Sequence, residues 1–172
     1  MEYIEDKQGI KRYLIQLVVN GDLRTVLVRA NMLLVNVLRE RFDLTGTKKG
    51  CEMGNCGSCT VLLDGKPVDS CLVLALEADG HEITTIEGVA QSDELDRLQD
   101  SFVENAAIQC GYCTPGMILS AKALLTRNPH PTEQEVREAI AGNLCRCTGY
   151  VNIVKAVLAA SANHEKEIGG AA

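Results

Sequence analysis

The sequence of 172 residues is poor in aromatic side chains, which make up only 3% of it, and it has no tryptophan. Its cores must therefore be built from aliphatic residues. It also lacks an excess of positive charge, since its net charge is -6, and so has no basic footprint for nucleic acid. No apolar run approaches the ~20 residues that a membrane-spanning helix needs. The composition predicts a globular protein that neither binds nucleic acid nor spans a membrane.

The first residues, Met1 to Lys7, have neither the basic region nor the apolar region of a secretory leader. We therefore expect a cytoplasmic protein. A framework of disulfides would need an oxidising compartment and is not expected here. The sequence also shows no grouping typical of a general base, a nucleophile or a phosphate-binding loop, and its three histidines are scattered. Catalysis is predicted to belong to another chain.

What the sequence does contain is eight cysteines, which fall into two sets of four. The first set has the spacing C-x4-C-x2-C with a fourth cysteine further on, as in the plant-type ferredoxins that bind a 2Fe-2S cluster. The second set is a C-x2-C pair followed much later by a C-x-C pair. Two four-thiolate metal sites are predicted, with ligands Cys51, Cys56, Cys59 and Cys71 in the first and Cys110, Cys113, Cys145 and Cys147 in the second.

Structural zinc is the main alternative for these cysteines, because C-x2-C pairs also bind zinc. The three-cysteine loop of the first set favours an iron-sulfur cluster, whereas the second set taken alone leaves zinc more open. Gly50, Gly54 and Gly57 interleave with the first three cysteines. This is expected if the backbone must come close to a cluster and direct its amides at sulfur.

The first half of the chain has the pattern of β-strands. Two β-rich runs, 14–19 and 23–29, flank Asn20-Gly21, which is a strong hairpin signal. Apolar residues at helical spacing follow over 33–42, then a second hairpin from Val61 through Asp64-Gly65 to Cys71, and a last strand over 83–86. This order predicts a β-grasp plant-type ferredoxin domain over residues 13–88, after a charged N-terminal extension, 1–12.

After Gly88 the apolar residues recur at helical spacing. Thr114 is predicted to be an N-cap and Pro115 a first-turn proline, so that a helix starts immediately after Cys113. Thr132 with Glu135 forms a capping box for a helix that runs to Gly142. A further helix is predicted over 151–162, and a first one opens at Ser92 with acidic residues in its first turn. The chain is thus predicted to be an α+β protein in which a C-terminal four-helix-bundle 2Fe-2S domain, 92–162, is followed by a tail, 163–172.

Three segments around the cysteines closely resemble the iron-sulfur subunits of the molybdenum hydroxylases, the xanthine dehydrogenase family. They run from Gly50 to Thr60, from Gln109 to Met117 and from Gly142 to Tyr150. The resemblance implies a non-catalytic electron-transfer subunit with two 2Fe-2S clusters, which relays electrons between a molybdopterin centre and FAD. It implies two partners, a large molybdopterin-binding subunit and a medium FAD-binding subunit, commonly assembled as a dimer of heterotrimers.

The resemblance also assigns a direction to the two cysteine sets. The set that begins with Cys51 matches the cluster on the flavin side, and the set that begins with Cys110 matches the cluster on the molybdenum side. Gln109 matches a glutamine that hydrogen-bonds the pterin, and Cys147 matches the ligand nearest the pterin edge. A free-standing two-cluster ferredoxin and a zinc-stabilised interaction module remain the alternative functions.

Several residues near the cysteines have two readings. Ser58 stands where many relatives have alanine, and its hydroxyl either donates to a cluster sulfur or is simply exposed. Lys48 and Lys49 are predicted to form a solvated loop face. Tyr112 and Tyr150 flank the second cysteine set and are predicted to screen it from water.

Overall fold

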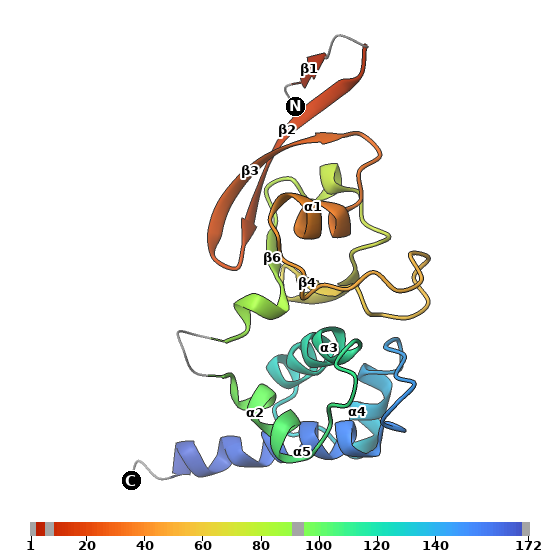
Figure 1. Ribbon diagram of the computed structural model, residues 1–172. Helices are drawn as coiled ribbons and strands as arrows, with labels where there is room; N and C mark the ends of the chain where they lie inside the picture. Colours follow the sequence, from red (N-terminus) through yellow and green to blue (C-terminus); the bar gives the residue numbers. More distant parts are fainter. Residues whose placement is uncertain (1–2, 6–8, 91–94, 170–172) are drawn as a thin grey trace.

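The computed structural model describes residues 3–5, 9–90 and 95–169, and side chains as far as residue 162. A β-rich half and a helical half lie one above the other along the long axis of the molecule, as Figure 1 shows. In the described chain, all the strands lie in the first half, together with one short helix and two 3-10 turns. The other helices lie in the second half. The protein is therefore of the α+β class.

The first half is built on a mixed sheet whose strands lie in the order β1-β2-β6-β4-β5, with β3 paired to the other side of β2. The predicted first hairpin is confirmed, because β2 (Lys11–Val19) and β3 (Asp22–Arg29) pair in antiparallel register on either side of Asn20-Gly21. Asn20 and Gly21 have φ angles of 53° and 87°, the left-handed conformation that a tight two-residue hairpin turn requires.

The second predicted hairpin is also present, as β4 (Thr60–Leu63) and β5 (Lys66–Asp69), and it ends two residues before Cys71. The last strand, β6 (Glu82–Thr84), pairs with both β2 and β4, which closes the sheet. It is shorter than predicted, since the chain turns into a 3-10 helix, η2, over Ile86–Gly88. Helix α1 (Leu34–Arg41) packs on the sheet, and a second 3-10 turn, η1, covers Ala75–Ala78.

The core of this half is aliphatic, as the composition predicts. It joins one face of the sheet to α1, and the members with the least exposed surface are Ile15, Leu17, Val19, Val28, Leu34, Val37, Leu38, Val61 and Ile83. A neighbouring small cluster contains Val35 of α1 together with Cys59 and Cys71. Two of the eight cysteines therefore lie against the main core.

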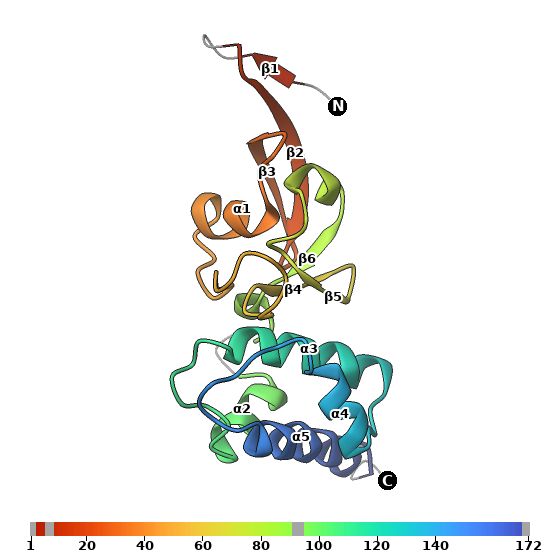
Figure 2. The same cartoon turned by 90° about the vertical axis from the view of Figure 1, so that its right-hand side faces the viewer.

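Within the N-terminal segment, residues 3–5 form a strand. Strand β1 (Tyr3–Glu5) pairs with the start of β2 in antiparallel register, Tyr3 opposite Tyr13 and Glu5 opposite Lys11. The rings of the two tyrosines lie 6.0 Å apart and Lys11 Nζ lies 4.6 Å from the Tyr3 ring. Figure 2 shows this strand pair projecting from the end of the sheet that is distant from the helices.

The second half consists of α2 (Arg97–Glu104), α3 (Thr114–Arg127), α4 (Glu133–Ala139) and α5 (Val151–Gly169). Its core is again aliphatic apart from one ring, and its most buried members are Leu98, Phe102, Met117, Leu119, Ala121, Val136, Ile140, Ile153, Ala156, Val157 and Ala160. The capping box at Thr132 is confirmed, since its hydroxyl accepts from Glu135 N and Glu135 Oε2 accepts from Thr132 N at 2.7 Å. No helix in the described part of the chain has the length and apolar character needed to cross a bilayer.

The predicted helix ends were less accurate than the helices themselves. Residues 92–94, predicted to open the first helix, lie outside the described residues, and α2 begins only at Arg97. Asp96 is its N-cap, because this carboxylate accepts from Leu98 N and Gln99 Oε1 accepts from Asp96 N. Asp96 followed three residues later by Gln99 is the sequence signal of this capping box, and the acidic residues upstream imitate it.

Three further ends differ from the prediction. Cys113, not Thr114, occupies the N-cap of α3, without a side-chain cap, so Thr114 is already the first helical residue and Pro115 the second. Helix α4 stops at Ala139, where the cap at Ile140 turns back on the last turn, instead of continuing to Gly142. Helix α5 continues past residue 162 to Gly169, because neither glycine nor proline interrupts it earlier.

The two halves share a packed contact. Leu62, on β4, belongs to the core of the helical half and is 7% exposed, while α3 lies against β4 and β5. Among the helices of the second half, both views show α3 nearest the sheet and α5 farthest from it. The loops that carry the cysteines lie at the edge of this contact.

Candidate metal centres

The first cysteine set lies in the loop between α1 and β4, with Cys71 added from the chain after β5. The thiol of Cys51 accepts backbone N–H groups from Met53 at 3.5 Å and from Asn55 at 3.3 Å. These two bonds, with Met53 the larger contributor, lower the pKa of Cys51 to about 7. Directed amides of this kind are what a thiolate ligand needs.

Two members of this set, Cys59 and Cys71, are buried. Cys59 and Cys71 are 2% and 3% exposed, and the Cys59 thiol also donates to Asp69 Oδ1 at 3.7 Å. Burial, assisted by the neighbouring Cys71 thiol and Asp69 carboxylate, raises the pKa of Cys59 to about 12. Without a cation Cys59 is therefore protonated, because a thiolate there would be buried without compensation.

The second set has one buried and one exposed pair. Cys113 is 9% exposed at the start of α3, and burial, followed by the Cys145 thiol, raises its pKa to about 12. Burial also raises the pKa of Cys145, but the Thr148 hydroxyl and N–H outweigh it, so the net shift is downward. Cys110 and Cys147 are exposed, and their sulfurs lie 3.5 Å apart.

Within each set the thiols interact in pairs. Cys51 interacts with Cys56 and Cys59 with Cys71, and in the second set Cys110 pairs with Cys147 and Cys113 with Cys145. A 2Fe-2S cluster requires this arrangement, since four cysteines bind its two irons. Among the described residues, no group of three or more histidine, cysteine, aspartate or glutamate side chains is gathered to hold a single metal ion.

The loop around the first set leaves space where a cluster would need it. A Cβ added to Gly50 would lie 2.8 Å from Cys56 Sγ and 3.4 Å from Ser58 Oγ, so any larger residue would push into this spot. Ser58 itself is 6% exposed. The reading of Ser58 as simply exposed is therefore wrong, and its hydroxyl faces Gly50 from the same loop as Cys56 Sγ. The donor set and the space both fit a 2Fe-2S cluster.

Residues predicted to be peripheral have definite structural roles. Lys48 and Lys49 are only half-exposed, and their ammonium groups donate to Thr45 O at 2.8 Å and to Asn36 Oδ1 at 3.0 Å. Lys49 also forms an ion pair with Glu52 at 3.1 Å. Both lysines thus remain partly solvated on the loop face and also fasten the first cysteine loop.

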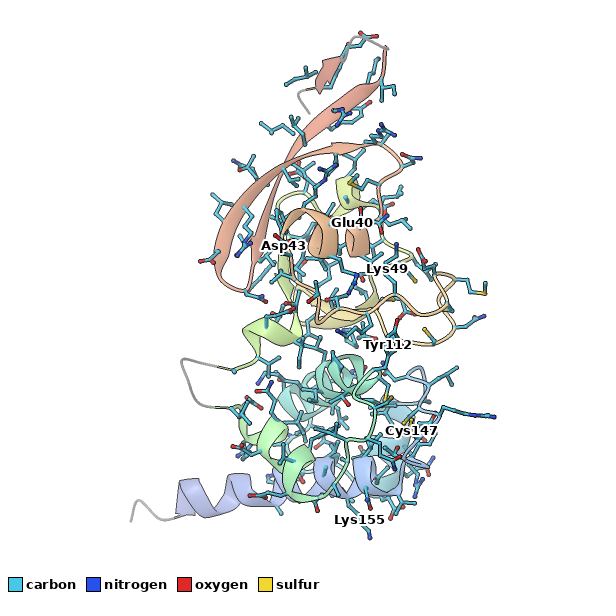
Figure 3. All side chains as sticks on the ribbon, in the orientation of Figure 1. Glu40, Asp43, Lys49, Tyr112, Cys147 and Lys155 are labelled. Carbon is cyan, nitrogen blue, oxygen red and sulfur yellow. The ribbon has the colours of Figure 1, made fainter. Side chains whose placement is uncertain are left out.

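The two tyrosines also do more than screen the second set. The Tyr112 hydroxyl donates to Lys49 O at 2.6 Å, and Figure 3 shows Tyr112 reaching from the helical half toward Lys49. The Tyr150 hydroxyl accepts from Cys145 N at 2.8 Å. Gln109, the predicted pterin contact, is exposed and precedes Cys110, so it lies beside the exposed pair of Cys110 and Cys147.

The two cysteine loops are joined by direct hydrogen bonds that the sequence did not reveal. Leu144 N donates to Cys56 O at 2.9 Å, and the buried Asn143 donates to Gly57 O at 2.8 Å and to Thr60 Oγ1 at 3.0 Å. In the sequence, Asn143 is one residue of the motif that runs from Gly142 to Tyr150. Its position between Gly142 and the Cys145-x-Cys147 pair was the one available signal, and it does not disclose a partner more than eighty residues away.

Known proteins match both halves of the chain. The 2Fe-2S iron-sulfur cluster binding domain family matches residues 17–90, and the 2Fe-2S binding domain family matches residues 85–158. The chain is 52% identical over 143 residues to the nicotinate dehydrogenase small FeS subunit of Eubacterium barkeri, which covers 83% of this chain and 91% of that subunit. It is 53% identical over 140 residues to the nicotine 6-hydroxylase small subunit of Paenarthrobacter nicotinovorans, covering 81% and 84%.

A solved structure agrees with these relatives. A chain in the crystal structure of quinoline 2-oxidoreductase from Pseudomonas putida 86 superposes with a TM-score of 0.87 at 47% identity, covering 92% of this chain and 98% of that one. Two matching 2Fe-2S families imply two 2Fe-2S clusters. Identity at this level over nearly the full length of small FeS subunits shows that the chain belongs to the electron-transferring iron-sulfur subunits of the xanthine dehydrogenase family of molybdenum hydroxylases.

Proposed function

We propose that the chain carries electrons between a molybdopterin centre and FAD that are held by two partner subunits, one large and one medium, in a dimer of heterotrimers in the cytoplasm. The observation that supports this most is the pairing of the eight thiols into two sets, one in each half, joined by the bond from Leu144 N to Cys56 O. A chain with two such sets offers a path for electrons from one half to the other.

In this proposal the order of the domains is a β-grasp plant-type ferredoxin domain, 13–88, followed by a four-helix-bundle domain, 92–162. The extension, 1–12, and the tail, 163–172, flank them. Cys51, Cys56, Cys59 and Cys71 would hold the first cluster, on the flavin side. Cys110, Cys113, Cys145 and Cys147 would hold the second, on the molybdenum side. Each bound cluster would supply one-electron transfer at a potential set by its surroundings.

The side chains of the protein set the conditions for this transfer. The amides of Met53 and Asn55 and the N–H of Thr148 point at ligand sulfurs, which stabilises their negative charge. Gln109 is proposed to donate or accept a hydrogen bond at the pterin, and the exposed Cys147 to lie nearest the pterin edge. The exposure of Gln109, Cys110 and Cys147 at one place supports a partner bound there.

The test is analysis of iron and acid-labile sulfide together with EPR of the reduced chain. Two distinct 2Fe-2S signals are expected from the unaltered protein. The variant Cys145→Ser should lose one signal and keep the other, because its ligand set lies wholly in the helical half. A zinc-loaded chain without EPR signal, or loss of both signals in the variant, would contradict the proposal.

A cluster-loaded chain must also be shown to work in a complex. Co-purification with a molybdopterin subunit and a flavin subunit is expected. In the complex, Cys145→Ser should block reoxidation of molybdenum by FAD while the first cluster remains. Full activity of the chain purified alone would contradict the assignment of catalysis to its partners.

A further inference from the structure

The contact between the two cysteine loops centres on one buried amide. Asn143 is 3% exposed and lies two residues before Cys145. Its Nδ2 group donates across the contact, to Gly57 O at 2.8 Å and to Thr60 Oγ1 at 3.0 Å. Its Oδ1 accepts from Ser120 Oγ, on α3, at 2.7 Å. The amide thus uses its donors on the β-rich half and its acceptor on the helical half.

The backbones meet closely at this amide. A Cβ on Gly57 would lie 2.5 Å from Gly142 O and 2.6 Å from Asn143 Nδ2. Gly57 also has a φ of 64°, so a side chain there would be strained as well as obstructed. The separation of the two loops is therefore determined by main-chain contact, and the Asn143 donors hold it at that separation.

The same contact lies between the two predicted clusters. Gly57 follows Cys56, and Leu144, which donates to Cys56 O, precedes Cys145. One hydrogen bond and a few covalent bonds therefore connect a ligand of one set with a ligand of the other. Because electron transfer slows steeply as the gap between redox centres widens, the geometry of this contact bears directly on the relay.

We propose that Asn143 is a positioning residue that fixes the separation and coupling of the two clusters through its two donor bonds to Gly57 and Thr60. This inference rests on the proposed function, since it needs both clusters. It assigns Asn143 no ligand role. Ser120 orients the amide by donating to Oδ1, so that both N–H groups face the β-rich half.

The variant Asn143→Asp tests this with little change in shape. Its carboxylate still accepts from Ser120, but it places an oxygen where Nδ2 faced Gly57 O, an acceptor that already receives Thr60 Oγ1 at 2.7 Å. The two Asn143 bonds across the contact are lost and a repulsion replaces the one to Gly57 O, while the bond to Ser120 within the helical half remains. A matched control is Asn105→Asp, because Asn105 Nδ2 donates to Ser101 O and Oγ inside its own half.

The measurements are made on the iron-loaded chain in its complex. Pulsed EPR should show weaker spin coupling between the two reduced clusters of Asn143→Asp, and rapid-mixing kinetics should show at least a tenfold slower transfer between them, with both individual signals retained. Asn105→Asp should change neither quantity. A merely structural role would lower thermal stability in both variants without changing the coupling.

A second variant covers the case in which Asn143→Asp does not fold. Thr60→Val keeps the shape of the side chain and removes its hydroxyl, which accepts from Asn143 Nδ2 and donates to Gly57 O inside the β-rich half. Only one of the two Asn143 bonds is lost, so the coupling should weaken in the same direction by less. Unchanged coupling and transfer rate in either folded variant would overturn the inference. The absence of two 2Fe-2S signals in the unaltered protein would instead refute the proposed function.

Discussion

At Gly116 the tight contact between the halves and helix propensity predict opposite effects of an alanine substitution on stability. Gly116 lies in the first turn of α3, where replacing glycine by alanine stabilises an unobstructed helix by up to about 1 kcal/mol. In this structure a Cβ on Gly116 would overlap the Gly57 carbonyl oxygen and lie 2.9 Å from Asn143 Nδ2. Both neighbours belong to the contact, so the clash is relieved only if the halves separate.

The energies can be compared directly. Inserting a carbon into a packed contact costs about 1–3 kcal/mol. Weakening the two Asn143 bonds adds about 1 kcal/mol for each. Set against the gain in helix propensity, Gly116→Ala should lower the free energy of unfolding by about 2–4 kcal/mol. That is a substantial part of the total stability of a domain, which is about 5–15 kcal/mol.

Chemical denaturation followed by circular dichroism measures this change, with Gly142→Ala as the matched control. Gly142 lies beside the same contact, but a Cβ there meets no atom within 4 Å and its φ is not in the left-handed region. The control should therefore be neutral or slightly stabilising. A Gly116→Ala chain as stable as the control, or more stable, would show that the two loops do not meet as tightly as described.

Two other predictions concern the cysteines. Burial raises the pKa of Cys59 and Cys113 to about 12, above the ordinary value of 9.0, so the folded iron-free chain holds these protons more tightly than the unfolded chain. The resulting stabilisation is complete below pH 9 and is lost as the pH rises toward 12. Denaturation of the iron-free chain should show this loss of stability, and the loss should be smaller in Cys59→Ala. A stability that does not fall over this pH range would contradict the prediction. Ser58→Ala should lower the reduction potential of the first cluster and leave the second unchanged in an EPR-monitored titration. The buried Ser58 hydroxyl faces Gly50, as Cys56 Sγ does, and a donor in this loop would stabilise the more negative reduced state. An unchanged first potential would refute this role of Ser58.

The parts of the fold that sequence could predict are those that depend on neighbouring residues. Asn20-Gly21 specifies its turn through the backbone conformation of two residues, and Thr132 with Glu135 caps a helix within four residues. The start of α2 was mispredicted although the signal of Asp96 and Gln99 was present, because several acidic residues competed for the same role. Strand β1 was missed because three residues carry too little pattern.

The candidate site divides in the same way. The cysteine spacing predicts two sets, since ligands must lie close to one another whatever the surroundings. The partners of Asn143, Tyr112 and Lys49 were not predictable, because each bond joins segments that are distant in sequence or depends on a loop path set by packing. A polar residue in a motif indicates that its side chain makes a hydrogen bond, but it does not identify the partner atom.

The glycines of the first cysteine loop show how one residue type serves two purposes. Gly50 leaves space beside Cys56 Sγ, as expected for a cluster, whereas Gly57 leaves space for the Gly142 carbonyl and Asn143 of the other half. Cys56, a proposed ligand of the first cluster, lies between them, and its carbonyl oxygen accepts from Leu144 N. The loop that a cluster would order is therefore the loop that docks the helical half. Because binding a cluster stabilises the folded conformation of its ligands, loading the first site should also tighten the contact with the second.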